Sequence, residues 1–317
     1  MEQQKRINVL WLPWDSKTTA SSRIRCYDLV PYFKEFTEYN IQIWPWDKTQ
    51  WTYKELEWPD IVVFQKNYIS NNARNLLSEF TSRQKKIVFD LSDSEWYDIR
   101  RIPFLNNMLY RSNAIVYTTD PIKEWLVKNQ INEKLLHHIP DRFDLSQYPE
   151  SNMKLHSDKN SFVIGWHGNK NTIKNLEILR PAIEKLAKDY LITVLTISNK
   201  DSSLFSLNFK CLNIHKVWKL ETYEKDLLQA DIIVNPRLDI EENKGKSNNK
   251  TVLAWLMGQP CVSYDSVKDW YEDIKNLIVI GAEGRSKIAF ENRKKAEEIY
   301  DLRISAKEWI KCFEGLK

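Results

Sequence analysis

A cluster of cationic and amide side chains lies in the stretch KGKSNNK, at residues 244–250. It leads into the apolar run TVLAWLM, which a glycine and a proline soon follow, so the pattern predicts a buried helix with a polar entrance. Ser247, Asn248 and Asn249 can cap the first amides of this helix. Lys246 and Lys250 flank these three residues. Amide donors, the positive end of a helix dipole and ammonium groups favour an anion, and a diphosphate fits best. An ordinary Asn-capped helix with surface lysines is the alternative.

A second polar turn, GWHGNKN, contains two of the chain's seven glycines, Gly165 and Gly168. Glycine is favoured where the backbone approaches another group closely, so this turn is a second candidate for ligand contact. Lys170 and Lys174 follow where the next helix is expected to begin. His167 fits a hydrogen-bonded structural role better than a catalytic one.

Two arginines follow the first apolar run, in SSRIRC. Ser21 or Ser22 can cap a helix whose first turn then contains Arg23 and Arg25. Arginine at a helix N-terminus opposes the dipole by roughly a few tenths of a kcal/mol, which an anion docked there would offset. A solvated arginine pair behind a good N-cap explains the pattern equally well.

Three carboxylates, Asp90, Asp93 and Glu95, lie close together in FDLSDSEW. Such carboxylates can do acid–base chemistry or hold the hydroxyl groups of a sugar. Capping of the next helix by Asp93 or Ser94 is the favoured single explanation. No arrangement of acids in the sequence compels a metal site, and none is expected.

Strands and helices must position these residues. The apolar runs of the sequence indicate where the strands lie. Nearly continuous Val, Ile and Leu runs, separated by helix-length segments, predict parallel strands covered on both faces. The runs are 7–12, 41–46, 60–66, 85–91, 114–120 and 135–140 in the first half, and 161–168, 191–197, 211–218, 230–236, 260–264 and 276–281 in the second. Each half is therefore expected to be a doubly wound α/β domain, with ligands at the carboxyl ends of its strands. A polar stretch at 145–160 marks the boundary, and 286–317 is strongly helical.

Composition excludes several classes of protein. Only seven glycines occur in 317 residues, where average usage gives about 22, and GxGxxG is absent. A net charge of +4 does not point to a nucleic-acid partner. Four widely spaced cysteines, Cys26 and Cys261 among them in apolar patterns, indicate free thiols in a reducing compartment. No stretch has the length of a signal peptide or membrane span, so we expect a cytoplasmic protein, with peripheral contact at the inner membrane face left open.

Four stretches together resemble a known family: SSRIRCYDLVPYF, IGWHGNKNTIKNLEIL, WKLETYEKDLLQADIIVNP and NKGKSNNKTVLAWLMGQPCVS. They are similar to the family-four (group 1) glycosyltransferases of the GT-B fold. The resemblance implies two Rossmann-like domains facing across a cleft. Residues 1–150, with a crossing helix at about 302–317, would bind the acceptor, and residues 151–301 the nucleotide-sugar donor. It also implies retention of anomeric configuration, with no cofactor and no required metal.

The resemblance assigns the donor to residues of the second half, with Val217 and Trp218 bordering the base: Gly168, Asn169, Lys170, Val217, Trp218, Ser247, Asn248, Asn249 and Lys250. Lys174 takes the place of a phosphate-binding lysine. We expect Lys174 and Lys246 to stabilise charge on the leaving diphosphate, and Asp93 to act on the acceptor side. Ser22 and Arg23 are expected to bind the acceptor or a phosphate.

The chain also departs from the family pattern. The Glu-x7-Glu motif is replaced by Gly245 and Leu253, and an arginine usual after Gly168 is Asn169. The leading hypothesis is a retaining, hexosyl-type transferase that moves a sugar from a nucleoside diphosphate to a glycan, a lipid-linked or another hydroxyl acceptor, in cell-surface glycan synthesis. The alternatives are a non-catalytic GT-B-fold binding or partner subunit, which Leu253 would favour, and a glycosyltransferase acting on modified DNA bases.

Overall fold

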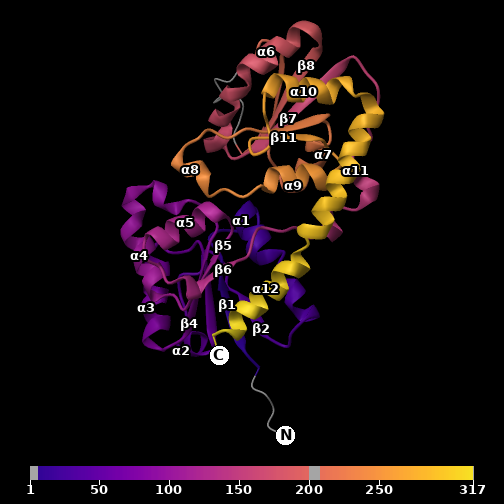
Figure 1. Cartoon of the computed structure of the whole chain (residues 1–317). Coiled ribbons are helices and arrows are strands. Elements are labelled where there is room, and N and C mark those ends of the chain that lie inside the picture. Colours follow the sequence, from indigo (N-terminus) through magenta and orange to yellow (C-terminus); the bar gives the residue numbers. More distant parts are fainter. Residues whose placement is uncertain (1–5, 200–207, 317) are drawn as a thin grey trace. The chain divides into compact units, whose positions relative to one another are not determined.

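The computed structural model describes residues 6–199 and 208–316, and the chain divides into two compact units. The first unit comprises Met1–Asp144, Ile240–Ser247 and Tyr300–Lys317, and the second comprises Leu145–Asp239 and Asn248–Ile299. The first unit therefore takes in two segments from far along the chain, one of them the C-terminal helix (Figure 1).

A six-stranded parallel sheet forms the centre of the first unit, in the order β2-β1-β3-β4-β5-β6. Its strands are β1 (Asn8–Leu12), β2 (Asn40–Ile43), β3 (Ile61–Gln65), β4 (Lys86–Leu91), β5 (Ala114–Tyr117) and β6 (Leu136–His138). Its helices are α1 (Ala20–Ser22), α2 (Tyr53–Glu57), α3 (Asn71–Ser82), α4 (Ile102–Arg111), α5 (Asp120–Lys128), α8 (Glu241–Lys244) and α12 (Leu302–Glu314). A π-helical turn, Arg23–Tyr27, continues directly from α1.

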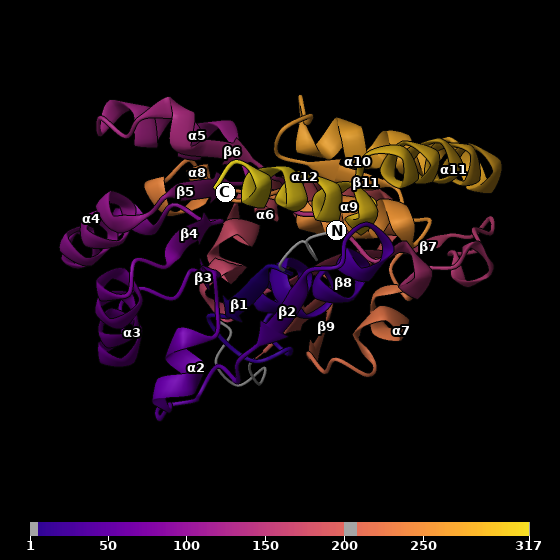
Figure 2. The same ribbon diagram turned by 90° about the horizontal axis from the view of Figure 1, so that it is seen from below.

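Both faces of this sheet are buried, which explains why its strands read as continuous apolar runs. Leu10 and Leu12 pack on one face with residues of α2, α3, α4 and α5. Val9 and Trp11 point to the opposite face, since side chains alternate along a strand, and there they meet α12 (Figures 1 and 2). The ring of Trp11 lies 4.7 Å from that of Trp309.

The second unit contains a five-stranded parallel sheet in the order β11-β10-β7-β8-β9. Its strands are β7 (Ser161–Gly168), β8 (Leu191–Ser198), β9 (Leu212–Val217), β10 (Ile232–Asn235) and β11 (Cys261–Ser263). A 3-10 helix (Lys170–Leu179) leads into α6 (Arg180–Asp189), and the other helices are α7 (Tyr223–Leu227), α9 (Asn249–Leu256), α10 (Trp270–Val279) and α11 (Gly281–Ile299). Every strand of both sheets lies in a run that the sequence predicts, except that β2 begins one residue before its run and β8 ends one residue after its run.

One predicted strand, at 276–281, is wrong: residues 276–279 continue the helix α10, and Gly281 begins α11. Asp269 caps this helix by accepting a hydrogen bond from the Glu272 amide, 2.9 Å away. Ile274 and Ile278 are buried four residues apart, whereas Val279 is exposed. This is the spacing of one helix face, and a short apolar run alone does not distinguish it from a strand.

Each sheet has a point where the order of its strands reverses. In the first unit β1 lies between β2 and β3, and in the second β7 lies between β8 and β10. Ligands of open α/β sheets bind at such points, beyond the carboxyl ends of the strands. The two points therefore mark where chemistry is expected in each unit.

Candidate functional site

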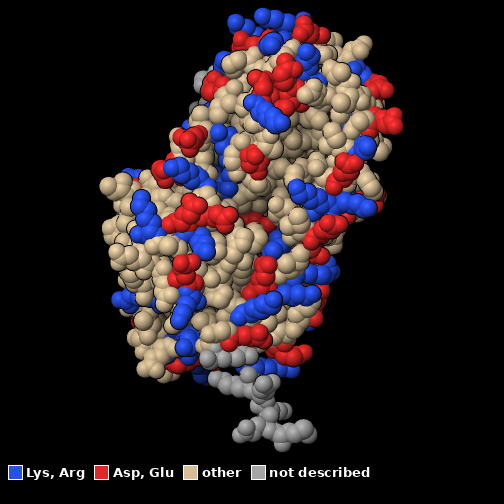
Figure 3. Space-filling model, in the orientation of Figure 1, with Lys and Arg blue, Asp and Glu red and all other residues tan. Residues whose placement is uncertain are grey.

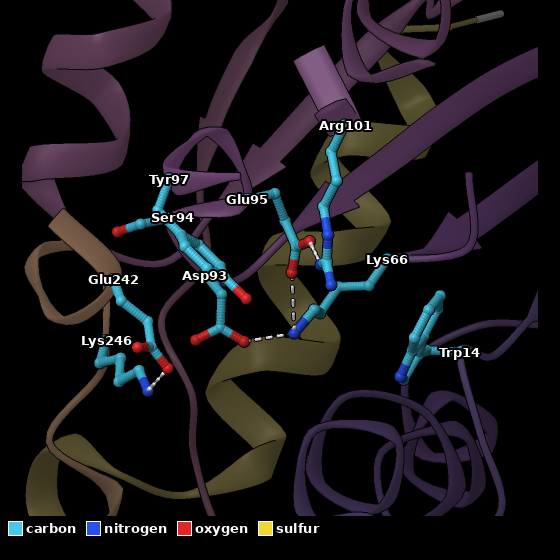
Figure 4. Close-up of a pocket in the computed structure, with 9 residues that line it drawn as sticks. All are labelled: Trp14, Lys66, Asp93, Ser94, Glu95, Tyr97, Arg101, Glu242 and Lys246. Atoms are coloured by element: carbon cyan, nitrogen blue, oxygen red, sulfur yellow. Dashed lines mark hydrogen bonds and ion pairs between the residues drawn. The ribbon is translucent and has the colours of Figure 1, made fainter. Parts of the chain in front are cut away.

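A hollow of about 220 Å³ opens in the first unit beyond the carboxyl ends of three neighbouring strands, β1, β3 and β4. This is the point of strand reversal. Charged and aromatic side chains line it: Trp14, Lys66, Asp93, Ser94, Glu95, Tyr97, Arg101, Glu242 and Lys246 (Figure 4). All of them belong to the first unit.

Lys66 lies at the centre of the hollow, directly after β3. Its backbone has φ 53, a left-handed conformation that costs free energy in a residue other than glycine and often marks a functional position. Its ammonium contacts the Asp93 carboxylate and lies 3.2 Å from Glu95 Oε1. Burial by itself would lower the pKa of Lys66, but these two carboxylates outweigh burial and raise it, so Lys66 is a fixed cation.

Glu95 is the most enclosed carboxylate of the hollow. It accepts hydrogen bonds from the Tyr68 hydroxyl at 2.9 Å and from Arg101 Nη1 at 2.6 Å. Burial would raise its pKa, yet Lys66, Tyr68 and Arg101 together hold that pKa below its ordinary value. Glu95 is therefore ionised and organises the cations around it.

Asp93 lines the hollow and is not a helix cap. The N-cap position of the next short helix is Ser94, and neither residue makes a side-chain cap there. Asp93 instead pairs with Lys66, and about a third of its side chain remains exposed to the hollow. Because an acceptor-only group held by one fixed cation keeps free lone pairs, Asp93 can bind a hydroxyl group.

Residues 240–247 form one wall of the hollow, although they follow β10 in the sequence. The Gly245 amide donates to Ser94 Oγ at 2.5 Å, and Thr119 Oγ1 donates to the Gly245 carbonyl at 3.3 Å. Ser247 Oγ donates to Asp141 Oδ2 at 2.6 Å. Two residues predicted for the donor, Lys246 and Ser247, therefore belong to the first unit.

A buried ion network supports this wall. The Arg25 guanidinium donates to both oxygens of Asp90, at 2.6–2.9 Å, and to Asp141 Oδ1 at 2.7 Å. Asp141 is also the acceptor for Ser247, so the network links the sheet to the wall. Burial raises the pKa of Asp90 although Arg25 opposes it.

Ser22 and Arg23 are not among the residues that line the hollow. Ser22 is fully buried inside the α1 segment, and its hydroxyl donates to Gln65 Oε1 at 3.1 Å. Arg23 is also buried, with Nη1 3.5 Å from the Lys17 carbonyl oxygen. The helix begins after Thr19, so Ser22 is not its cap.

In the second unit, Gly168 ends β7 at the point of strand reversal and meets the start of α9. A side chain at Gly168 would place its Cβ 2.8 Å from Lys250 Nζ and 2.6 Å from the Trp166 ring. The Lys250 ammonium lies 4.6 Å from the centroid of that ring, a cation–π contact. Gly168, Trp166 and Lys250 thus form one close-packed group.

The helix α9 is fixed at both ends by different means. Asn235, at the end of β10, donates to Thr251 Oγ1 at 3.0 Å and holds the first turn. At the other end Gly258 has φ +69, and the amides of Gly258 and Gln259 donate to the carbonyls of Trp255 and Ala254. This Schellman motif confirms the predicted glycine stop.

The predicted cap of α9 by the Asn248 side chain is not formed. Asn248 occupies the N-cap position without a side-chain cap, and its amide nitrogen instead donates to Asp265 Oδ2 at 2.6 Å. Asn249 is the first helical residue. The entrance of α9 is therefore not closed by the Asn248 side chain.

The remaining predicted donor residues lie around β7 and β9. Asn169 caps the following 3-10 helix by accepting from the Asn171 amide at 3.0 Å. Lys170 and Lys174 are exposed on that helix. Val217 is exposed at the end of β9, and the ring of the half-buried Trp218 lies 5.7 Å from that of Tyr223.

Five residues of the hollow were not predicted: Trp14, Lys66, Tyr97, Arg101 and Glu242. The position of Lys66, immediately after a buried strand, was a usable signal. Arg101 offered none, because its contact with Glu95 depends on how the two short 3-10 helices, Glu95–Tyr97 and Ile99–Arg101, turn the chain back.

Neither a metal-binding cluster of side chains nor a helix that could span a membrane occurs in residues 6–199 and 208–316. Within these ranges no cluster of three or more His, Cys, Asp or Glu side chains could hold a metal ion. No helix of the same described part is both long and apolar enough to span a bilayer.

Comparison with known proteins gives no match to a family model and none to a curated protein sequence. Solved structures do match over the full chain. HepE of Anabaena with UDP and glucose is 13% identical, with a TM-score of 0.68 over 98% of this chain and 100% of that one. Sucrose-phosphate synthase of Thermosynechococcus elongatus is 10% identical, with a TM-score of 0.68 over 98% of each chain.

A third structure is an α-glucosyltransferase with UDP and a 13-mer DNA containing an A:G mismatch. It is 11% identical, with a TM-score of 0.61 over 98% of this chain and 97% of that chain. At such identities the likeness establishes architecture alone. The chain therefore has the GT-B fold, two doubly wound α/β domains with the C-terminal helix returning to the first.

Proposed function

We propose that this protein is a retaining glycosyltransferase that moves a sugar from a nucleoside-diphosphate donor to a hydroxyl acceptor. The observation that carries the proposal is the group formed by Gly168, Trp166 and Lys250 at the strand reversal of the second unit. The glycine lets the Lys250 ammonium lie close to the end of β7, where that ammonium and the entrance of α9 supply positive potential. Structures with the same fold contain UDP.

The chemistry assigned to these residues is charge stabilisation. When the glycosidic bond breaks, negative charge accumulates on the leaving diphosphate, and groups that bind it better in the transition state lower the barrier. We assign this role to Lys250, the α9 amides and Lys174. Lys246, which lines the hollow of the first unit beside Glu242, is assigned to the acceptor side together with Asp93.

Calorimetric titration with UDP and with uridine tests the donor assignment. Lys250→Ala removes one charge-assisted contact, worth roughly 1.5–3 kcal/mol, so UDP should bind about ten- to a hundredfold more weakly. Uridine affinity should stay the same, because uridine has no phosphate. Lys268→Ala removes an exposed lysine of the same unit and is the matched control. Equal UDP affinity in Lys250→Ala and Lys268→Ala would refute the assignment.

One observation favours a second function, a binding subunit without activity. Leu253 stands where the related family has a ribose-binding glutamate, and it is buried in α9. An apolar side chain there offers no acceptor to a ribose hydroxyl. UDP binding without release of UDP from any UDP-sugar, in the presence of acceptors, would support this function over transfer.

The proposed setting is cell-surface glycan synthesis in the cytoplasm, with peripheral contact to the inner membrane face. Basic and acidic side chains alternate over the face drawn in Figure 3 and form no broad basic surface there. This mixture does not favour a nucleic-acid acceptor, which needs a continuous basic track. Co-sedimentation with anionic vesicles tests the membrane contact.

A further inference from the structure

Each cation that lines the hollow of the first unit lies beside a carboxylate of the same hollow. The pairs are Lys66–Asp93, Lys66–Glu95, Arg101–Glu95 and Lys246–Glu242. Three cations and three carboxylates line the hollow, so their formal charges cancel. A site built for phosphate or carboxylate would instead present an excess of cations.

An anion that entered this hollow would meet each cation already next to a carboxylate. It would have to approach Asp93, Glu95 or Glu242 as closely as it approached the cations, and like charges at such distances repel. A ligand without charge meets no such penalty. It can accept hydrogen bonds from the cations and donate to the carboxylates at once.

Two aromatic side chains add apolar surface on the walls. Trp14 and Tyr97 are 37% and 44% exposed, so part of each ring is open to a ligand. Trp14 is positioned by its backbone amide, which donates to the buried Gln65 side chain at 2.9 Å. Arg101 lies 5.6 Å from the Tyr97 ring centroid and steadies it. In Figure 4, Trp14 lies on one side of the Lys66–Asp93 pair and Glu242 with Lys246 on the other.

Aromatic faces next to paired charged groups match the chemistry of a sugar ring, which has C–H faces and a rim of hydroxyl groups. The volume of about 220 Å³ is below the roughly 300–1,000 Å³ of a site for a drug-sized molecule, which suits one ring. We infer that this hollow binds an uncharged sugar residue of the acceptor. The inference rests on the proposed function, in which the first unit receives the acceptor, and it narrows that acceptor to a neutral glycan.

The test uses saturation-transfer NMR on the full chain with a fixed panel of probes. The neutral probes are the methyl glycosides of glucose, galactose, mannose and N-acetylglucosamine. The charged probes are glucuronate, glucose 1-phosphate and a short single-stranded DNA. At least one neutral glycoside should bind, and the charged probes should bind about tenfold more weakly or not at all.

Matched variants locate the binding. Trp14→Ala should reduce neutral glycoside affinity about tenfold, whereas Tyr110→Ala, which removes an exposed ring on α4, should not change it. Glu242→Gln leaves the hollow with one excess positive charge, so affinity for glucuronate should rise severalfold. Glu241→Gln makes the same charge change on the neighbouring residue outside the hollow and should leave it unaltered.

UDP titration separates the two proposals. If UDP binds but no neutral glycoside of the panel does, or charged probes bind more tightly, the neutral-sugar inference is wrong and the donor site stands. If neutral glycosides bind in a Trp14-dependent way but UDP does not bind, the proposed transferase function fails instead. Retained glycoside affinity in Trp14→Ala would also overturn the inference.

Discussion

Gly245 is the tightest point at which residues 240–247 meet the rest of the first unit. A Cβ at this position would lie 2.6 Å from Ser94 Oγ and 2.9 Å from both the Ser94 amide nitrogen and Ile122 Cγ1. Ile122 is fully buried, and the Ser94 amide is backbone, so neither can move aside. The φ of Gly245 is −86, which alanine adopts without strain, so any effect of Gly245→Ala is steric.

The expected cost follows from two contributions. Overpacking costs about 1–3 kcal/mol, and losing the hydrogen bond from the Gly245 amide to Ser94 Oγ costs about 0.5–1.5 kcal/mol. A total of about 2–4 kcal/mol should weaken attachment of residues 240–247. Their amide hydrogens should then exchange roughly thirty to eight hundred times faster, as measured by mass spectrometry.

The control is the same substitution where there is room for it. A Cβ at Gly315 would meet only the Cys312 and Lys311 carbonyl oxygens, at 3.5 and 3.8 Å. Gly315→Ala should therefore leave exchange at 240–247 unchanged. Unaltered exchange in Gly245→Ala would show that this segment is not held by the contacts described, and the wall of the hollow would lose its structural basis.

Two further predictions concern buried charge. The pKa of Glu95 is held below its ordinary value, so its contribution to stability is present above the unfolded pKa of about 4.3 and is lost as pH falls through the folded value. Urea midpoints of Glu95→Gln should therefore fall less steeply than those of the wild type below about pH 4.3, and parallel curves would contradict this. Arg25→Met leaves Asp90 and Asp141 buried without their shared cation, at a cost of about 3–5 kcal/mol in urea unfolding, and adding Asp90→Asn should recover part of it. An unfolding free energy within about 1 kcal/mol of the wild type would show the network to be dispensable.

The strands could be predicted from the sequence because burial on both faces makes them continuous apolar runs. The run at 276–281 was misread for the same reason, since Ile274 and Ile278 show a helical spacing only when the residues before 276 are included. The end of α9 was predictable because glycine readily adopts the positive φ that ends a helix, and Gly258 has that conformation. Its start was not, since Asn248 turns to Asp265, a partner 17 residues away.

The hollow was only partly predictable. Asp93 was identified from its place after a strand, and Lys66 occupies the equivalent place after the neighbouring strand. The ion pair between Lys66 and Asp93 could not be predicted from any local pattern, because it depends on β3 and β4 lying side by side. The position of Lys246 in the first unit depends on contacts that join residues more than 100 positions apart, such as Gly245 to Ser94.

The placement of α12 has a consequence for how the protein is made. One face of the first sheet, which includes Trp11, is covered in part by Trp309 and Phe313 of α12, nearly 300 residues later in the chain. At about 5–20 residues per second, synthesis leaves that face without α12 for roughly 15–60 seconds. Throughout this interval the growing chain exposes aromatic surface that is buried in the folded protein, and such surface is what chaperones bind. Synthesis of α12, rather than completion of the N-terminal segments, is therefore the event that lets the first unit finish folding.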